Sequence, residues 1–328
     1  MKRTQKNLKR PLLALLAVLL LSVPLIFSGF PYAILICCFI LLYVIAVSGL
    51  DIVFGYCGQI SMGHAAFFAI GAYGSCLLHD YCGIPIMLTM VIAAVLAASV
   101  GAVIAYPASK LVFHFLSLAT LSFGEIVYQI ISHSPGGITN NFVGYYTESI
   151  NFFGLTLDTY PRFYYYALGC AVLFLTAKQM LVNSQVGRAF IAIRENHHAA
   201  DGMGVNVRKY KVIAFAVSAF YTAFAGAMYA HLVRYISPDT FMQKQSVMFL
   251  TMLLFGGTAS LAGPICGVTV VMLLNELLRS AERYQMFIYG ILLLVVIVLI
   301  PGGIYGTVEK AIKNVFRRKK EAAKDAAG

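Results

Sequence analysis

The feature that most constrains this chain is a succession of apolar runs of about 20 residues, which few charges interrupt. Between Pro11 and Ala177 the only lysine or arginine residues are Lys110 and Arg162. A helix of about 20 apolar residues spans the hydrocarbon core of a bilayer. Since 60% of the 328 residues are hydrophobic and 11% are charged, the sequence predicts an all-α membrane protein that crosses the bilayer several times.

Seven apolar spans are predicted in the first part of the chain. The first run, Pro11 to Phe27, is expected to stay as a membrane span, because it is longer than the apolar region of a signal peptide and has no A-x-A-like cleavage site. The spans lie at 11–29, 32–50, 62–79, 85–106, 111–131, 163–182 and 212–233.

The distribution of basic residues predicts the orientation of these spans. The polar segment 183–211 contains five of them, Arg188, Arg194, Arg208, Lys209 and Lys211, and is therefore placed in the cytoplasm. The loop 132–162 carries a single arginine and falls outside. The basic tail 306–328 and the N-terminus are expected in the cytoplasm. Since the charges flank apolar spans and form no stripe with aromatic residues, the sequence does not indicate nucleic-acid binding.

The region after residue 245 decides the number of crossings. The segment 285–300 is one further span, so 246–280 must cross an even number of times if the tail is to be cytoplasmic. Gly256, Gly257, Gly263 and Pro264 interrupt it, which favours two short helices or a re-entrant pair. The prediction is about ten crossings, including this pair, within a single transmembrane domain over 1–328.

Glu125 lies in the middle of a predicted span. A carboxylate there usually faces the interior of a helix bundle, because exposure to hydrocarbon is costly. Two interpretations remain open. Glu125 either lines or gates a pathway, or it is a structural hydrogen-bond anchor.

The glycine-rich stretch before residue 65 is the second candidate for a pathway. Gly58, Gln59, Ser61, Gly63 and His64 suit a broken helix whose amides bind an anionic group. Small residues also allow close packing of helices, which is the alternative. The break at Gly256 and Gly257 is a third candidate.

Motifs for catalysis are missing from the sequence. It has no H-E-x-x-H pair, no G-x-S-x-G elbow and no His/Cys/Asp set at metal-ligand spacing, so no catalytic or metal site is predicted. A G-x-x-x-x-G-K-[ST] loop is also missing. No cofactor is therefore expected on this chain, and ATP would be hydrolysed by another subunit.

Four separated blocks resemble the LivM-type permease subunit of branched-chain amino acid ABC importers. They are GYCGQISMGHAAFFAIGAYGSCLL at 55–78, LATLSFGE at 118–125, the stretch 187–230, and FGGTASLAGPICG at 255–267 together with YGILLLVVIVLIPGGIYG at 289–306. The resemblance implies a permease in the bacterial plasma membrane that translocates leucine, isoleucine and valine. It also implies four kinds of partner: a second homologous permease subunit, two cytoplasmic ATPases, an extracytoplasmic solute-binding protein and the lipid bilayer.

The cytoplasmic loop 183–211, which the resemblance implies is a coupling loop and which is called so below, supports this resemblance through its own residues. From Ile191 the sequence alternates apolar and polar residues at helical spacing and breaks at Gly202 and Gly204, which predicts a short amphipathic helix ending in a turn. Such a helix docks in a groove of another protein, or it rests on the membrane surface. With the family in view, docking to the ATPase is expected, and the contact residues are Arg188, Arg194, Glu195, Ala199, Ala200 and Gly204.

Two other functions remain compatible with the sequence. A related ABC permease for urea or short amides shares the same pattern, because specificity lies chiefly in the binding protein. An ion-coupled secondary transporter would instead use Glu125 and would need no ATPase.

Overall fold

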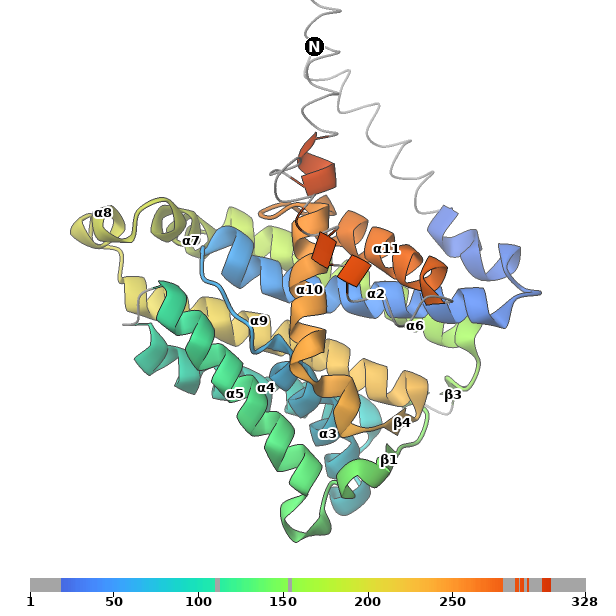
Figure 1. Ribbon diagram of the computed structural model, residues 1–328. Helices are drawn as coiled ribbons and strands as arrows, with labels where there is room; N and C mark the ends of the chain where they lie inside the picture. Colours follow the sequence, from blue (N-terminus) through green and yellow to red (C-terminus); the bar gives the residue numbers. More distant parts are fainter. Residues whose placement is uncertain are drawn as a thin grey trace, which may run out of the picture.

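The computed structural model describes residues 19–109, 113–152, 155–279, 287–288, 290–291, 294 and 303–307. Within this part of the chain almost all regular structure is helical (Figure 1). Both chain termini, most of the predicted span 285–300, nearly all of the tail 306–328 and the start of the span 11–29 lie outside the described residues.

Ten α-helices, α2 to α11, have bounds within the described residues, and residues 19–26 and 303–307 are also helical. They are α2 (Pro31–Asp51), α3 (His64–Cys82), α4 (Ile86–Ala108), α5 (Phe113–His133), α6 (Tyr160–Asn183), α7 (Gln185–Glu195), α8 (His197–Gly202), α9 (Val207–Val233), α10 (Gln243–Gly256) and α11 (Ala262–Leu277). Short turns of other helix types lie at Ile52–Tyr56 (π), Pro135–Gly137, Asn141–Val143 and Pro238–Phe241 (3-10).

Four two-residue strands lie in the connections. β1 (Tyr145–Tyr146) pairs antiparallel with β4 (Tyr235–Ile236), and β2 (Asn151–Phe152) pairs antiparallel with β3 (Leu155–Thr156). The first of these pairs joins the connection after α5 to the end of α9.

In the described part of the chain, five helical segments are long and apolar enough to cross a bilayer, and each overlaps a predicted span. They are Pro31–Tyr56, Ile86–Ala108, Phe115–His133, Tyr160–Asn183 and Val207–Val233. The predicted span 62–79 is also helical, as α3, but α3 is not one of the five. The chain is therefore an all-helical membrane protein.

The segment 246–280 forms two short helices, as predicted. α10 has 14 residues and α11 has 16. At 1.5 Å per residue they are about 21 and 24 Å long, which is shorter than the roughly 30 Å hydrocarbon core. In Figure 1, α10 crosses α2 at a steep angle, whereas α11 runs beside α2.

Local sequence signals account for several helix ends. Pro31 begins α2, where a missing N–H costs nothing. The side chains of Ser184, Asn196 and Asn206 accept hydrogen bonds from backbone amides at the starts of α7, α8 and α9. Gly83 ends α3 in the left-handed conformation that glycine adopts at no steric cost.

α9 is the central helix of the bundle and packs against α2, α3 and α4. Its neighbours approach closely because glycine takes the place of a side chain at each contact. A Cβ atom on Gly71 of α3 would lie 1.8 Å from the carbonyl oxygen of Ala223, and one on Gly226 of α9 would lie 2.0 Å from the carbonyl oxygen of Phe68. Small residues at such contacts are how membrane helices gain packing energy.

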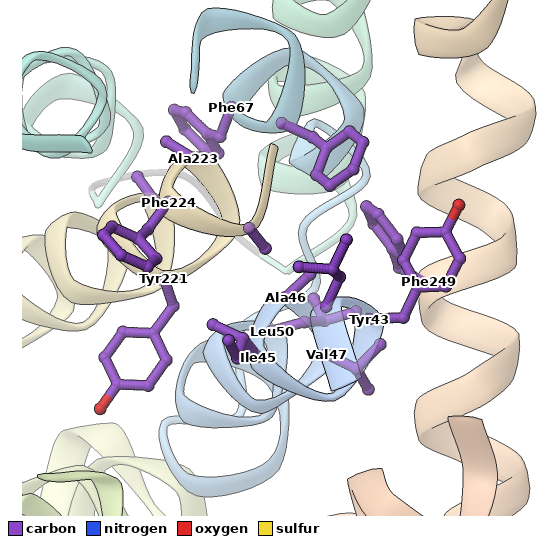
Figure 2. Packing of buried hydrophobic residues seen from close by; sticks show 14 of the residues in the cluster. Tyr43, Ile45, Ala46, Val47, Leu50, Phe67, Tyr221, Ala223, Phe224 and Phe249 are labelled. Atoms are coloured by element: carbon purple, nitrogen blue, oxygen red, sulfur yellow. The ribbon is translucent and has the colours of Figure 1, made fainter. Parts of the chain in front are cut away.

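Aromatic side chains fill the remaining space around α2. Figure 2 shows Tyr43 and Phe249 side by side between α2 and α10, and their ring centroids are 5.7 Å apart. On the other side of α2, Tyr221 and Phe224 of α9 lie close to Ile45 and Leu50 (Figure 2). α2 is thus held on two sides.

The connections divide between the two ends of the bundle. α7 and α8 lie beyond the end of the bundle where α9 begins, and β1, β3 and β4 lie at the end where α9 stops (Figure 1). This separation positions the coupling loop away from the strands of the predicted outer loop.

Candidate coupling surface and translocation pathway

The coupling loop 183–211 forms two helices, so the prediction of one short amphipathic helix is wrong. α7 ends at Glu195, and Asn196 takes an extended conformation with φ −159° and ψ 108°. Its side-chain oxygen then accepts hydrogen bonds from the amides of His198 and Ala199, at 3.0 and 3.1 Å. Asparagine competes well with the helix for these amides, and this competition is why the helix breaks there.

The apolar face of α7 is not free to receive a partner. Phe190 and Ile193 are 0% and 3% exposed, and the ring of Phe190 packs edge-to-face on Tyr210 of α9. The predicted apolar anchors therefore fix α7 to its own chain. Met203, which is 86% exposed at the end of α8, is a large apolar side chain that remains available.

Five of the six predicted coupling residues separate into two groups. Arg188, Glu195, Ala199 and Gly204 are exposed, whereas Ala200 is buried and supports the packing of α8. Gly204 ends the turn with φ +84° in open space.

Arg194 is bound to the membrane bundle in addition to being exposed. Its Nη1 donates a hydrogen bond of 2.6 Å to the carbonyl oxygen of Gly55. A Cβ atom on Gly58 would lie 3.0 Å from Cγ of Arg194. The coupling loop therefore meets the glycine-rich stretch directly, a contact that the sequence analysis did not predict.

His197 contributes to the electrostatics of α8. Partial burial lowers its pKa first, and the neighbouring His198 and Lys211 lower it further. An imidazole whose pKa is below the usual value of about 6.5 is neutral at pH 7. His197 therefore adds less positive charge to the exposed surface at neutral pH than an unperturbed histidine would.

The predicted helix break before residue 65 is confirmed. α2 runs into the π-helical turn Ile52–Tyr56, residues 57–63 are not helical, and α3 begins at His64. The expected free amides are in part occupied, because Met62 N donates to Thr120 Oγ1 and Ala65 N donates to Ser246 Oγ. These two amides are satisfied by hydroxyl groups and do not await an anion.

The polar side chains of this stretch point into the bundle. His64 is 1% exposed; its Nδ1 lies 3.1 Å from Ser61 Oγ and its Nε2 lies 2.7 Å from Ser218 Oγ. Gln59 and Gly63 are also buried, and Gln59 Nε2 donates to the carbonyl oxygen of Cys57. His64 thus links α3 to α9 in this conformation.

Glu125 lies on an exposed face of α5. Ser122, Glu125, Gln129 and His133 are exposed, follow one another at a spacing of three or four residues and therefore share one face of the helix. Gln129 Nε2 donates a 2.7 Å hydrogen bond to Glu125 Oε1. These side chains line a shallow hollow of 650 Å³ together with apolar neighbours.

The exposed polar face of α5 restricts what can surround it in the membrane. A row of polar side chains at mid-helix is costly against lipid, so it requires either another subunit or water. Among the described residues, the hydrogen bond recorded for the Glu125 carboxylate comes from its own helix. The pathway interpretation and the interpretation of Glu125 as a structural hydrogen-bond anchor therefore both stay predictions.

Gly256 and Gly257 form the tight contact between α10 and α11. A Cβ atom on Gly256 would lie 1.8 Å from the carbonyl oxygen of Gly263, and Gly257 adopts φ +107°. In this conformation close packing accounts for Gly256, and the left-handed backbone accounts for Gly257.

A buried ion pair close to both glycine-rich segments was missed by the sequence analysis. Lys178 Nζ lies 2.8 Å from Asp51 Oδ2, and the two side chains are 1% and 0% exposed. Lys178 falls inside the predicted span 163–182, and Asp51 directly follows the span 32–50. Opposite charges at such positions indicate a pair, which is the signal that was available.

Comparison with known proteins identifies relatives over most of the chain. A family model described as the permease component of branched-chain amino acid transport systems matches residues 32–297. The high-affinity branched-chain amino acid transport system permease protein LivM of Escherichia coli (strain K12) is 32% identical over 288 residues, which cover 80% of this chain and 68% of that protein. The protein of the same name from Salmonella typhimurium is 29% identical over 287 residues, with the same coverage.

More distant similarity extends to permeases of other importers. The ribose import permease protein RbsC of Haemophilus influenzae is 28% identical over 135 residues, which cover 39% of this chain and 42% of that protein. No solved structure shows a significant match.

Proposed function

Because this chain belongs to the family of permease components of branched-chain amino acid transport systems, we propose that it is the membrane-spanning permease subunit of an ATP-driven ABC importer. Its substrates would be leucine, isoleucine and valine, which an extracytoplasmic solute-binding protein delivers. Two cytoplasmic ATPase subunits would hydrolyse ATP, and this chain would itself bind no cofactor. A second, homologous permease subunit completes the pore.

The proposed topology is a single transmembrane domain over 1–328 in the bacterial plasma membrane. It has ten crossings, with α10 and α11 counted as the short pair and both termini in the cytoplasm. The five long apolar segments support this arrangement, as does the position of α7 and α8 at one end of the bundle. Under this topology the strands β1 to β4 lie on the outer side, where the binding protein docks.

The observation that carries the proposal is the surface of the coupling loop. α7 is fixed to the bundle by the burial of Phe190 and Ile193 and by the bond from Arg194 to Gly55. α8 projects beyond it with Ala199 and Met203 exposed. A rigidly held helix with an exposed tip suits docking in a groove of another protein, because little conformational entropy is lost on binding.

The proposed pathway runs along the exposed face of α5 that contains Ser122, Glu125 and Gln129. The second permease subunit would face it across the pore. Glu125 would offer its carboxylate to the ammonium group of a zwitterionic amino acid. The segments 55–63 and 256–264 would change their packing when the pore switches between outward and inward access.

Uptake of labelled leucine and labelled urea into cells that lack this chain, re-supplied with the wild type, tests the substrate. Restored leucine uptake that disappears on ATP depletion is the expected result. If only urea uptake were restored, the ATP-driven mechanism would stand, but the substrate would be urea in place of branched-chain amino acids. Leucine uptake that survives ATP depletion would favour the ion-coupled alternative.

Ala199→Glu tests the docking surface. The residue is the third of α8, where glutamate favours the helix by interacting with its N-terminal amides, so the local fold is preserved. We expect at least about tenfold less ATPase subunit to co-purify, because one unpaired charge buried at an interface costs more than about 1.4 kcal/mol. Ala199→Ser is the control of small size, and co-purification should stay at the level of the wild type. If equal amounts of the ATPase subunit co-purified with both variants, α8 would not be part of the interface with the ATPase.

A further inference from the structure

The buried pair Asp51–Lys178 holds a third element besides the two helices that carry it. Asp51 ends α2, and Lys178 lies in the last two turns of α6. Asp51 Oδ1 accepts a hydrogen bond of 2.7 Å from the amide of Ala259, and Lys178 Nζ donates one of 3.2 Å to the carbonyl oxygen of Ser260. Both charged groups therefore bind the loop that joins α10 to α11.

Burial makes these bonds difficult to exchange. Charges removed from water are tolerated only when their partners satisfy them fully, since each unmet hydrogen bond leaves the desolvation cost uncompensated. The two side chains are 1% and 0% exposed. The loop 257–261 is consequently tied to α2 and α6 for as long as the pair stays intact.

The same pair lies against the turn that receives the coupling loop. A Cβ atom on Gly55 would lie 1.9 Å from Asp51 Oδ1 and 2.6 Å from Ala259 N, so the π-helical turn packs directly on the pair. The carbonyl oxygen of Gly55 accepts the 2.6 Å hydrogen bond from Arg194. An unbroken series of contacts thus leads from α7 through the turn and Asp51 to Ala259.

We propose that Asp51 is a positioning residue that transmits movement of the coupling loop to the α10–α11 hairpin. Its bond to Ala259 is the mechanical link, and Lys178 neutralises the buried carboxylate so that this link exists at all. The inference rests on the proposed function, because it requires that α7 be moved by an ATPase.

The two short helices that this loop joins are packed tightly against each other. α10 and α11 pack through Gly256, Gly263 and Gly267 with their backbones in contact. Such a tightly packed hairpin moves as one body when its loop is displaced. A shift of α7 would then tilt the hairpin against α2 and change the packing of the segment 256–264.

Two double variants that differ in one hydrogen bond test the proposal. Asp51→Asn/Lys178→Met removes both charges but leaves an amide oxygen to accept the Ala259 bond. Asp51→Leu/Lys178→Met removes the charges and that bond with a side chain of similar size. Replacing both members of a buried pair by neutral groups usually preserves folding, whereas removing one member leaves an unpaired charge.

The measurement is leucine uptake per ATP hydrolysed by the whole transporter in liposomes, with and without binding protein. We expect Asp51→Asn/Lys178→Met to stay within about threefold of the wild-type ratio. Asp51→Leu/Lys178→Met should keep its ATP hydrolysis, but its leucine uptake per ATP hydrolysed should fall at least about tenfold, because the hairpin no longer follows α7.

Three results would overturn the proposal. Asp51→Leu/Lys178→Met could keep the wild-type ratio of leucine uptake to ATP hydrolysis. Both double variants could lower this ratio equally. Finally, uptake and ATP hydrolysis could fall in parallel with the amount of folded protein. The last result would assign the pair a purely structural role. Failure of the wild type itself to couple leucine uptake to ATP would instead refute the proposed function.

Discussion

Gly71→Ala is expected to abolish the folded protein. The new Cβ atom would lie 1.8 Å from the carbonyl oxygen of Ala223 and 2.6 Å from its Cα atom. Both are backbone atoms, so α3 and α9 must move apart. The cost should reach or exceed the upper end of the about 1–3 kcal/mol typical of overpacked cores, a large fraction of the stability of most proteins. Size-exclusion chromatography and thermal unfolding in detergent would measure the loss.

Gly169→Ala is the matched control for this prediction. Gly169 lies inside α6, and no atom comes within 4 Å of the Cβ atom that alanine would add there. Alanine favours a helix over glycine by about 0.5–1 kcal/mol, so this variant should be as stable as the wild type or slightly more stable. If Gly71→Ala behaved like Gly169→Ala, the contact between α3 and α9 would be looser than described.

Glu125→Gln is expected to lower leucine uptake by about ten- to a hundredfold while the transporter still hydrolyses ATP. A hydrogen bond to a charged group contributes about 1.5–3 kcal/mol, and each 1.4 kcal/mol corresponds to a factor of about ten. Glutamine keeps the size of the side chain and its ability to bond Gln129, so α5 should remain intact. Uptake and ATP hydrolysis of the reconstituted transporter would be measured together.

The control for Glu125→Gln is Glu276→Gln, the same chemical change on α11, outside the proposed pathway and docking surfaces. Glu276 accepts a 2.7 Å hydrogen bond from the Tyr32 hydroxyl, and the side-chain oxygen of glutamine can accept the same bond. Uptake should be unaffected. Unchanged uptake in Glu125→Gln would place this face outside the pathway. Complete loss of uptake, together with wild-type uptake that needs no ATP, would support the ion-coupled alternative.

The long apolar helices and the breaks between them were predictable from local sequence. Runs of apolar residues need no partner to become membrane helices, because the lipid itself forces every backbone group into internal hydrogen bonds. The non-helical stretch at 57–63 and the pair α10 and α11 were also indicated, since glycine and proline act on the backbone where they stand. The break at Asn196 escaped prediction because helical periodicity continued through it.

The functional assignment of individual residues depended far more on the tertiary structure. His64 and Glu125 both stood out as polar residues in apolar runs. The fold encloses His64 between Ser61 and Ser218 and leaves Glu125 on an open face of α5. Nothing in the local sequence distinguishes these outcomes, because each depends on which distant helix packs against the residue.

The sequence by itself thus determined the class of protein, the family and most helices, because hydrophobicity, backbone chemistry and motif spacing are local properties of the chain. Only the tertiary structure decided which groups meet. Asp51 and Lys178 are separated by 127 residues, and Arg194 reaches Gly55 across 139. The packing of α2, α6 and α7 brings these distant groups together. Burial then makes the hydrogen bonds of the Asp51–Lys178 pair obligatory.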